Sequence, residues 1–393
     1  MYQAKSIRRD NGGEELVERK QGLSLRSFGT LHLLLLLLAF GIGGCIPDPV
    51  VPDQEAIDTP PSGVIVVNQG VWRGDNASLT LYDVEGDTSY TDWFSRQNEG
   101  LRIGDTGNDI LIRDNRAYVA VSQSGAIEVL ALPDGASLGR IRLPSGTFPQ
   151  QLLLLNDSVG WVSSLDDDAV YQFNTSSLEV MKRIPVGPAP EGIAYAAHHL
   201  FVANSGLGAL RADEPGAGTI RVIDPLSGEV IGNIAVGGNL RDLFYSPLTG
   251  NLYCFVGASL PDTSGSGLVE IDPVKLEVRR RWSVSGAWEI GFDPHGERAY
   301  IIAEGGIFRI EFPELGIISD ETVPLPFLAR SFSTLEEEVP HSIAVSSSTG
   351  EVFVGLARGY YSAPGRVDRY SYDGRFLGSF PTGLNPAAFG FVE

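Results

Sequence analysis

Short apolar segments with an aromatic residue near the start recur along the chain from residue 64 to its end. Six copies carry the aromatic residue, and a seventh, residues 64–68, has Ile65 in its place. The equivalent positions are 65, 118, 161, 201, 253, 300 and 353, separated by 53, 43, 40, 52, 47 and 53 residues. Repeats of this length built from short strands are typical of β-propeller blades.

A second short strand and a turn follow each copy of the repeat. In four repeats the second strand ends in a short polar residue, which we expect to bond its own turn: Asp83, Asn174, Asp224 and Asp272. In several repeats a third strand ends at glycine, as at Gly187 and Gly383. No helical periodicity separates these strands, so the pattern predicts four-stranded blades around a channel.

The two ends of the repeat region complement each other. The last repeat stops at residues 389–393, one strand into an eighth copy, while the first repeat begins one strand late at Val64. Pairing of these two strands would complete one blade and leave no free edge between the chain ends. The sequence therefore predicts an all-β, seven-bladed β-propeller of four-stranded blades over residues 63–393, closed by pairing of the N- and C-terminal strands.

The segment before the repeats has the features of an export signal. Basic residues precede an apolar run at residues 33–42, which is about half the ~20 residues that a membrane span needs. Ile42-Gly43-Gly44-Cys45 has the pattern of a bacterial lipobox, in which the cysteine is lipidated. We expect a signal peptide at 1–44, a lipid anchor at Cys45, and a flexible proline-rich tether over 45–62. The alternative is a plain secretory signal with an incidental cysteine.

Composition limits the partners of the exported chain. The formal charge is -20, and removing residues 1–44 takes away six basic and four acidic residues, leaving about -22. Such a surface argues against nucleic acid as a partner. With Cys45 assigned to lipid, Cys254 is the remaining cysteine, and its apolar neighbours predict a buried thiol. We expect the protein in the cell envelope, lipid-anchored at the outer membrane and exposed at the cell surface, with the periplasm-facing side as the alternative.

Two sets of motifs resemble known propellers. Leu-Phe-Val-Ala-Asn-Ser-Gly at 200–206, followed by Gly-Thr-Ile-Arg-Val-Ile-Asp at 218–224, resembles the YVTN/YncE class of repeats. Residues 67–70, 76–80, 104–109 and 190–192 resemble surface propeller lipoproteins of Bacteroidota. That group includes BtuG-type proteins, which capture vitamin B12 and pass it to an outer-membrane transporter. The resemblance implies a nutrient-binding lipoprotein, with cobalamin or another corrinoid as ligand and a transporter as partner.

Loops that join the second strand of a blade to the third share one face with the links between blades. Four of these loops are long: residues 69–76, 205–218, 257–267 and 358–365. Long loops on a rigid scaffold commonly carry binding residues, whereas the turns of the opposite face are short. The long loops contain Trp72, Tyr360 and Tyr361, which are suited to stacking on a flat ligand.

The links between blades supply a second set of candidates, once they are aligned on the apolar residue expected to open each innermost strand. Those apolar residues are Ile110, Leu152, Ile193, Leu243, Ile290, Ile343 and Phe389. Two places earlier stand Asn108, Gln150, Glu191, Arg241, Trp288, His341 and Ala387. One place earlier stand Asp109, Gln151, Gly192, Asp242, Glu289, Ser342 and Ala388. Because the first of these positions varies in chemistry, we expect it to form a ring around one asymmetric ligand. The alternative is that these residues bond backbone at the channel mouth.

The complete predicted ligand-binding set adds two asparagines from the matching motifs. It comprises Asn68, Trp72, Asn108, Gln150, Glu191, Asn204, Arg241, Trp288, His341, Tyr360 and Tyr361. The four histidines after residue 44 have no metal-ligand spacing, and Asp166-Asp167-Asp168 lacks the rest of a calcium loop, so we predict a solvated turn there and neither metal nor resident cofactor.

Three functions remain open from the sequence. The favoured one is a binding lipoprotein for a sizeable polar nutrient, and the second is a protein-interaction scaffold in an envelope complex. The third is a propeller lyase or lactonase, in which Glu191, Asp242 and His341 would serve as acid and base. We expect that the protein is not an enzyme.

Overall fold

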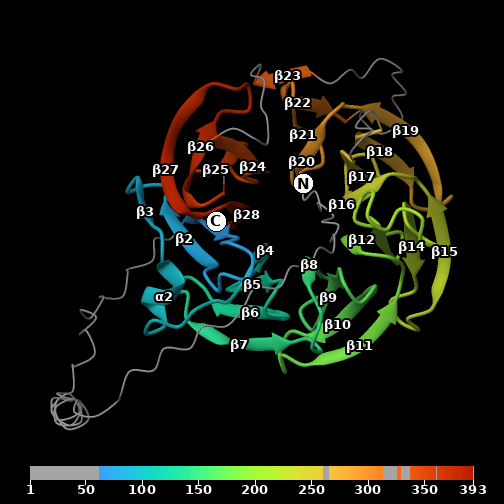
Figure 1. Cartoon of the computed structure of the whole chain (residues 1–393), viewed down its shortest axis with the longest axis horizontal. Helices are drawn as coiled ribbons and strands as arrows, with labels where there is room; N and C mark the ends of the chain where they lie inside the picture. The colour runs from blue at the N-terminus through green and yellow to red at the C-terminus, as the bar shows by residue number, and fades with distance from the viewer. Residues whose placement is uncertain (1–61, 260–264, 313–324, 329–336, 360, 393) are drawn as a thin grey trace, which may run out of the picture. The chain divides into compact units, whose positions relative to one another are not determined.

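Seven four-stranded antiparallel sheets make up the described part of the chain. The computed structural model describes residues 62–259, 265–312, 325–328, 337–359 and 361–392. All of them belong to the compact unit Glu55–Glu393. The sheets stand side by side as blades around a central axis (Figure 1). The predicted seven-bladed β-propeller is therefore confirmed.

Each blade is built outward from the axis. The innermost strands of blades one to seven are β28 (Pro386–Val392), β4 (Gly107–Arg113), β8 (Pro149–Leu154), β12 (Pro190–Ala196), β16 (Asn239–Tyr245), β20 (Ala287–Phe292) and β24 (Glu338–Val345). The second strands are β1 (Gly63–Asn68), β5 (Arg116–Val121), β9 (Val159–Ser164), β13 (His199–Asn204), β17 (Leu252–Gly257), β21 (Arg298–Ala303) and β25 (Val352–Arg358).

Two further strands complete each blade. The third strands are β2 (Ser78–Asp83), β6 (Ala126–Ala131), β10 (Ala169–Asn174), β14 (Thr219–Ile223), β18 (Gly267–Asp272), β22 (Gly306–Glu311) and β26 (Ala363–Tyr370). The outer strands are β3 (Thr88–Tyr90), β7 (Ser137–Arg142), β11 (Val180–Pro185), β15 (Val230–Ala235), β19 (Glu277–Ser283), β23 (Leu325–Leu328) and β27 (Phe376–Leu384).

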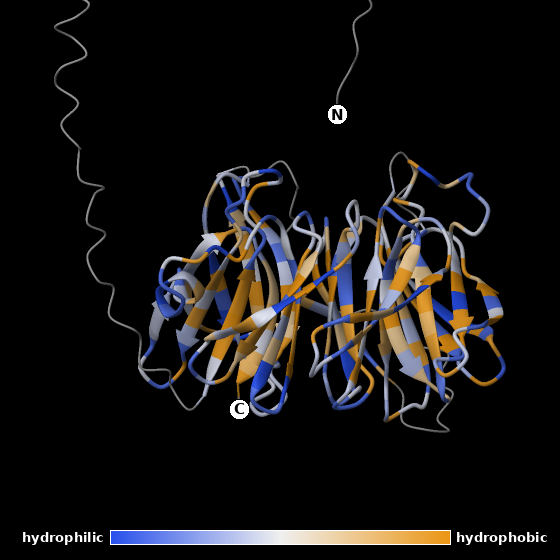
Figure 2. Cartoon of the chain, turned by 90° about the horizontal axis from the view of Figure 1, so that it is seen from below, coloured by the Kyte–Doolittle hydropathy of each residue, from blue (hydrophilic) through white to orange (hydrophobic). Residues whose placement is uncertain are grey.

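Strand order divides the connections between two sides of the propeller. Because neighbouring strands are antiparallel, the second-to-third connections and the links between blades lie on one side, which we call the loop face. The first-to-second and third-to-outer turns lie on the other side, which we call the turn face. Figure 2 shows the blades from the side, with hydrophobic residues concentrated in the strands.

The first blade is assembled from both ends of the chain. β28 pairs antiparallel with β1, from Gly63 opposite Val392 to Asn68 opposite Pro386. This pairing hides the edge of each strand and links the last blade to the first. The predicted closure is confirmed.

The recurring aromatic residue of the repeat fills the space between blades. Tyr118, Trp161, Phe201, Tyr253, Tyr300 and Phe353 are all buried on second strands, and each belongs to the apolar cluster shared with the following blade. Ile65 takes the same place between blades one and two. Neighbouring blades diverge away from the axis, so a large side chain at this position keeps their junction packed. Among the described residues, the apolar core thus consists of seven such junctions.

Several local predictions are also confirmed. The side chains of Asp83, Asn174, Asp224 and Asp272 each accept two backbone N–H groups of their own turns, at 2.7–3.4 Å. Cys254 is fully buried in β17, and burial raises the pKa of its thiol.

Other features differ from the sequence prediction. A short helix, α2 (Trp93–Gln97), follows β3 and buries Trp93 and Phe94 against the first two blades, although no helix was expected. The loop predicted at 358–365 is shorter, because β25 runs through Arg358 and β26 begins at Ala363. Within the described ranges, no helix is long and apolar enough to cross a membrane.

The junction between blades seven and one, which closes the ring of blades, should contribute strongly to the free energy of unfolding. Phe380 on β27 is buried between blades seven and one, where its ring stacks on Tyr82 with centroids 3.9 Å apart. We expect Phe380→Ala to lower the free energy of unfolding by about 3–5 kcal/mol, because it leaves a cavity in this junction. Phe376 lies largely exposed on the same strand, where its ring meets Tyr370 edge-on, so Phe376→Ala should change it by about 1.5 kcal/mol or less. Urea denaturation measures both, and equal losses would contradict the packing of this junction.

Candidate functional site

A cavity of about 470 Å³ lies at the propeller axis, where the innermost strands meet. Its lining comes from the innermost strands of all seven blades and from Gln69, the residue that follows β1, and half of the lining residues are polar. The polar lining residues are Gln69, Asn108, Asp109, Gln150, Gln151, Glu191, Arg241, Asp242, Glu289, His341 and Ser342. Four of these side chains are carboxylates and one is a guanidinium.

A break in strand pairing directs these side chains toward the axis. In every blade the register between the innermost and second strands shifts at the same place, for example between Gly107 and Asp109 and between Pro190 and Ile193. A bulge of this kind leaves residues unpaired and turns their side chains. The candidate ring therefore lies inside the innermost strands, which begin earlier than the sequence predicted.

The residues one place before the apolar anchor connect the innermost strands to one another. Asp109 Oδ2 accepts the Leu152 N–H at 2.7 Å, and Gln151 Oε1 accepts the Ile193 N–H at 2.6 Å. Each of these bonds joins one blade to the next. We call Asp109, Gln151, Asp242, Glu289 and Ser342 the inner belt.

Ser342 and Gly192 occupy the same position in their blades, and there too the innermost strands of neighbouring blades are held together. Ser342 Oγ donates to the Pro386 carbonyl at 2.6 Å and so links blade seven to blade one. At Gly192 an added Cβ would stand 2.5 Å from the Arg241 carbonyl oxygen, because the two innermost strands approach closely there. Gly192 is thus required because the innermost strands of blades four and five touch directly at this position, which leaves no room for a side chain.

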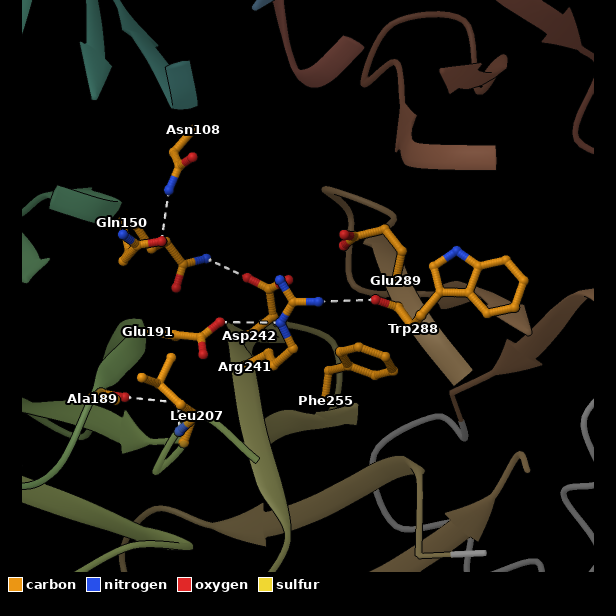
Figure 3. Close-up of polar contacts among 12 residues, drawn as sticks. Asn108, Gln150, Ala189, Glu191, Leu207, Arg241, Asp242, Phe255, Trp288 and Glu289 are labelled. Carbon is orange, nitrogen blue, oxygen red and sulfur yellow. Dashed lines mark hydrogen bonds and ion pairs between the residues drawn. The ribbon is translucent and has the colours of Figure 1, made fainter. Parts of the chain in front are cut away.

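Five of the residues two places before the anchor form a polar rim around the cavity: Asn108, Gln150, Glu191, Arg241 and His341. Figure 3 shows the first four. Asn108 Nδ2 donates to Gln150 Oε1 at 2.6 Å, and Arg241 Nε donates to Glu191 Oε2 at 3.0 Å. Gln150 and Arg241 also donate to the carbonyls of Phe148 and Trp288. The rim residues therefore bond both one another and the backbone, so a ligand would have to compete for some of these donors.

Burial within the channel shifts the acid–base behaviour of the inner belt. It raises the pKa of Asp242 to about 8, with the neighbouring Glu289 contributing next, while Gln151 Nε2 donates to Asp242 Oδ1 at 3.0 Å. Burial also raises the pKa of Glu289, and that of Asp109 to about 6. At neutral pH the cavity thus carries less negative charge than its four carboxyl groups suggest.

The basic groups of the cavity shift in opposite directions. The nearby carboxylate of Glu191 raises the pKa of Arg241, which stays charged. Burial lowers the pKa of His341 to about 4, and the charge on Arg241 adds to the effect. His341 is therefore a neutral imidazole, able to accept one hydrogen bond and donate another.

Trp72 stands on the loop face on a firmly held loop. Its indole is 63% exposed, its Nε1 donates to Gln123 Oε1 at 2.7 Å, and the Arg73 guanidinium lies 4.2 Å from its ring centre. Asp105 accepts the backbone N–H groups of Arg73 and Asp75 at 3.1 and 3.0 Å, which holds both residues at positive φ. Strained backbone fixed in this way is frequent at binding sites. The aromatic platform is thus preformed.

Tyr361 lies close to the rim. Its ring meets His341 edge-on, with centroids 5.7 Å apart. Asn385 Nδ2 donates to the carbonyls of Tyr361 and Gly70, at 3.1 and 2.9 Å, and so ties the loops of blades one and seven together. Tyr360 and Cys45 lie outside the described residues.

Three predicted ligand-binding residues are placed elsewhere. Asn68 and Asn204 are fully buried at the ends of β1 and β13, where their amides donate to Thr80 and Thr219 Oγ1 at 2.9 and 3.4 Å. Both asparagines therefore lie buried between strand ends of their own blades and are not exposed on the loop face. Trp288 packs against the apolar cluster of blades six and seven, and its Nε1 donates to the Pro340 carbonyl at 3.0 Å. Figure 3 shows its indole pointing away from Arg241.

Two glycines lie directly against the buried asparagines, because a larger residue would clash with them. An added Cβ at Gly187 would stand 2.8 Å from the Asn204 side chain, and one at Gly383 would stand 2.5 Å from Ser78 Oγ and 2.8 Å from Asn68 Nδ2. The glycines that end outer segments of the repeat therefore make room for these amides. This pairing is the sequence signal that identifies Asn68 and Asn204 as part of the scaffold.

Sequence reasoning missed other lining residues. Gln69, which lines the cavity, directly follows the predicted Asn68, and the acidic members of the inner belt stand next to the predicted ring positions. The sequence did not show which of two adjacent residues faces the cavity, because that depends on where each strand is bulged. The turn at 166–168 is not only solvated, because Asp168 accepts two hydrogen bonds from the Arg211 guanidinium, at 2.8 and 2.7 Å.

Among the described side chains, no group of three or more His, Cys, Asp or Glu could hold a metal ion.

Comparison with known proteins places the chain in a family without an assigned role. Residues 62–290 match the family described as "Domain of unknown function (DUF5074)". The chain belongs to this family. The match covers the three outer strands of blade one, blades two to five and the beginning of blade six. No curated protein matches this DUF5074 chain.

Solved structures match the DUF5074 chain in fold. A quinonprotein alcohol dehydrogenase-like protein from Bacteroides thetaiotaomicron is 16% identical, with a TM-score of 0.61, covering 84% of this chain and 78% of that one. Hydrazine synthase from Kuenenia stuttgartiensis is also 16% identical, with a TM-score of 0.58, covering 72% of this chain and 88% of that one. At this identity the likeness shows the propeller architecture alone.

The raised pKa of Asp242 predicts a pH-dependent stability. The folded protein holds a proton that the unfolded chain releases above about pH 4, so stability falls as pH rises from about 4 to about 8. Asp242→Asn keeps an acceptor for Gln151 and removes the charge. Between about pH 4 and pH 8 we expect the unfolding free energy of Asp242→Asn to fall less than that of the wild type. The difference between the two decreases should be at least about 1.4 kcal/mol, which corresponds to one pKa unit.

Urea denaturation at several pH values measures this difference. The matched control is Asp213→Asn, which changes an exposed aspartate of the loop at 205–218 and should leave the profile unchanged. Parallel profiles for the wild type and Asp242→Asn would contradict the buried, protonated state of Asp242.

Proposed function

We propose that the protein is a lipid-anchored binding protein of the cell envelope, which captures a polar ligand on its loop face at the mouth of the central cavity. Cys45 would carry the lipid, and the outer membrane would be its location. Binding, without chemical conversion of the ligand, is the proposed activity.

The combination of the cavity and a fixed aromatic platform carries this proposal. The rim offers unlike groups on different blades, with amides at Asn108 and Gln150, a carboxylate at Glu191 and a guanidinium at Arg241. Trp72 and Tyr361 stand on loops of the same face, and both loops are tied down by hydrogen bonds. A cavity of mixed polarity, with a rigid aromatic side chain on the same face, suits a ligand that is partly flat and partly polar.

A corrinoid is the ligand that we propose to test first. It is a flat macrocycle with amides at its edge, so it could stack on Trp72 while its amides exchange hydrogen bonds with Asn108, Gln150 and Gln69. The resemblance to BtuG-type propellers supports this choice, as does the presence of both donors and acceptors at the rim. Passage of the ligand to an outer-membrane transporter is the corresponding proposal for its partner.

Catalysis has a weaker basis in the same cavity. Glu191, Asp242 and His341 all line it, but Glu191 is paired with Arg241 and Asp242 accepts a bond from Gln151. Asp242 is largely protonated at neutral pH and one oxygen of Glu191 is bonded to Arg241, so neither carboxyl group is arranged as a free base. We therefore place these residues in ligand binding and in support of the channel.

Titration calorimetry with cyanocobalamin and the chain without its lipid tests the proposal. We expect binding at micromolar concentrations or tighter, and Trp72→Ala should weaken it about tenfold or more, because an exposed tryptophan at a binding site commonly contributes more than the 1.4 kcal/mol that this factor represents. The free energy of unfolding should stay almost unchanged.

Leu210→Ala is the matched control for this experiment. Leu210 is 84% exposed on the same face and makes no side-chain hydrogen bond, so its loss should alter affinity by less than about twofold. Absence of both heat and co-elution would exclude the corrinoid and favour a protein-interaction scaffold. Equal affinity of Trp72→Ala and wild type would exclude Trp72 from the site.

A further inference from the structure

The described chain enters the propeller on the turn face. Gly63, the first residue of β1, lies opposite Asp83, which leads into the turn at 84–87, and opposite Val392, which ends β28. Both neighbours mark the turn-face end of the first blade. The segment that contains Cys45 therefore joins the propeller on the side opposite the rim and Trp72.

Three large apolar side chains project from the turn face without cover from described residues. Leu226 is 92% exposed, Val274 is 77% exposed and Tyr372 is 60% exposed. They occupy the turns between the third and outer strands of blades four, five and seven. We call these three residues the apolar tips. They lie on three of the seven blades, all on the turn face.

Two of the apolar tips are held outward by their own turns. Asp224 accepts the Leu226 N–H at 2.8 Å, and Asp272 accepts the Val274 N–H at 3.0 Å. These carboxylates are thereby committed to local backbone, which holds the pKa of each below its usual range. The fixed turns keep Leu226 and Val274 from folding back onto the blades.

A lysine lies next to each of these two apolar tips. Lys182 Nζ donates to the Ser227 carbonyl, next to Leu226, and Lys275 follows Val274 directly. Apolar side chains with neighbouring amphipathic cations are typical of surfaces that rest in the headgroup region of a bilayer, and tyrosine is enriched at the same depth.

We propose that the turn face rests on the lipid headgroups of the membrane, with the apolar tips in contact, so that the loop face points into solution. This inference rests on the proposed lipid anchor at Cys45, which brings the membrane to the side where β1 begins. The formal charge of -20 favours zwitterionic over anionic lipids. Transfer of ligand to a transporter in the same membrane would then require the loop face to turn toward that transporter.

Two leucines of blade four allow a matched test. Leu210 lies on the loop face and Leu226 on the turn face, and both are largely exposed. The full lipidated chain, carrying either Leu210→Cys or Leu226→Cys, is labelled with a fluorophore and reconstituted into phosphatidylcholine vesicles that contain a headgroup nitroxide lipid. The natural Cys254 is buried and should stay unlabelled.

We expect the nitroxide lipid to cause loss of fluorescence from the Leu226→Cys label and no loss from the Leu210→Cys label. Equal quenching at both positions, stronger quenching at position 210, or no quenching at either would overturn the proposed orientation while the protein still floats with the vesicles. Failure of the lipidated chain to float at all would overturn the anchor and the orientation together. Flotation therefore separates the failure of the proposed anchor from that of the turn-face contact.

Discussion

Hydrogen bonds that pass from one innermost strand to the next are the constraint on which the centre of this propeller depends. Around the axis the strands are bulged, and a bulge leaves N–H groups that the neighbouring strand of the same blade does not accept. Asp109 and Gln151 accept such groups at Leu152 and Ile193. The same bonds that satisfy the backbone therefore bring carboxylates and amides into a narrow channel, where burial raises the pKa of Asp242 to about 8.

The fold could be predicted from the sequence because every blade repeats the same physical solution. The aromatic residue on the second strand fills the junction with the following blade, and Tyr118 and Phe353 show this at distant points of the ring. Chain closure was visible because one strand is missing at the start and one is added at the end. The short helix at Trp93 was not visible, since five residues carry too little periodicity to identify a helix.

The candidate site was only partly predictable. Variation at the rim indicated Asn108, Gln150, Glu191 and Arg241, which do line the cavity. Whether such a side chain faces a ligand or a neighbouring blade depends on distances across the axis and on the exact position of each bulge, and a repeat pattern contains neither. Trp288 shows the consequence, because its indole packs between blades six and seven, opposite in direction to the rim.

The division of the molecule into a loop face with preformed aromatic residues and a turn face with short hairpins is the basis of the proposed function. Hydrogen–deuterium exchange of the protein, free and saturated with cyanocobalamin, tests it most directly, because exchange reports on each backbone segment separately. We predict added protection in the loop at 69–77, at Tyr361 and at the start of the innermost strands. Protection confined to the turns at 224–229 and 273–276, or no change in any segment, would contradict a binding site on the loop face.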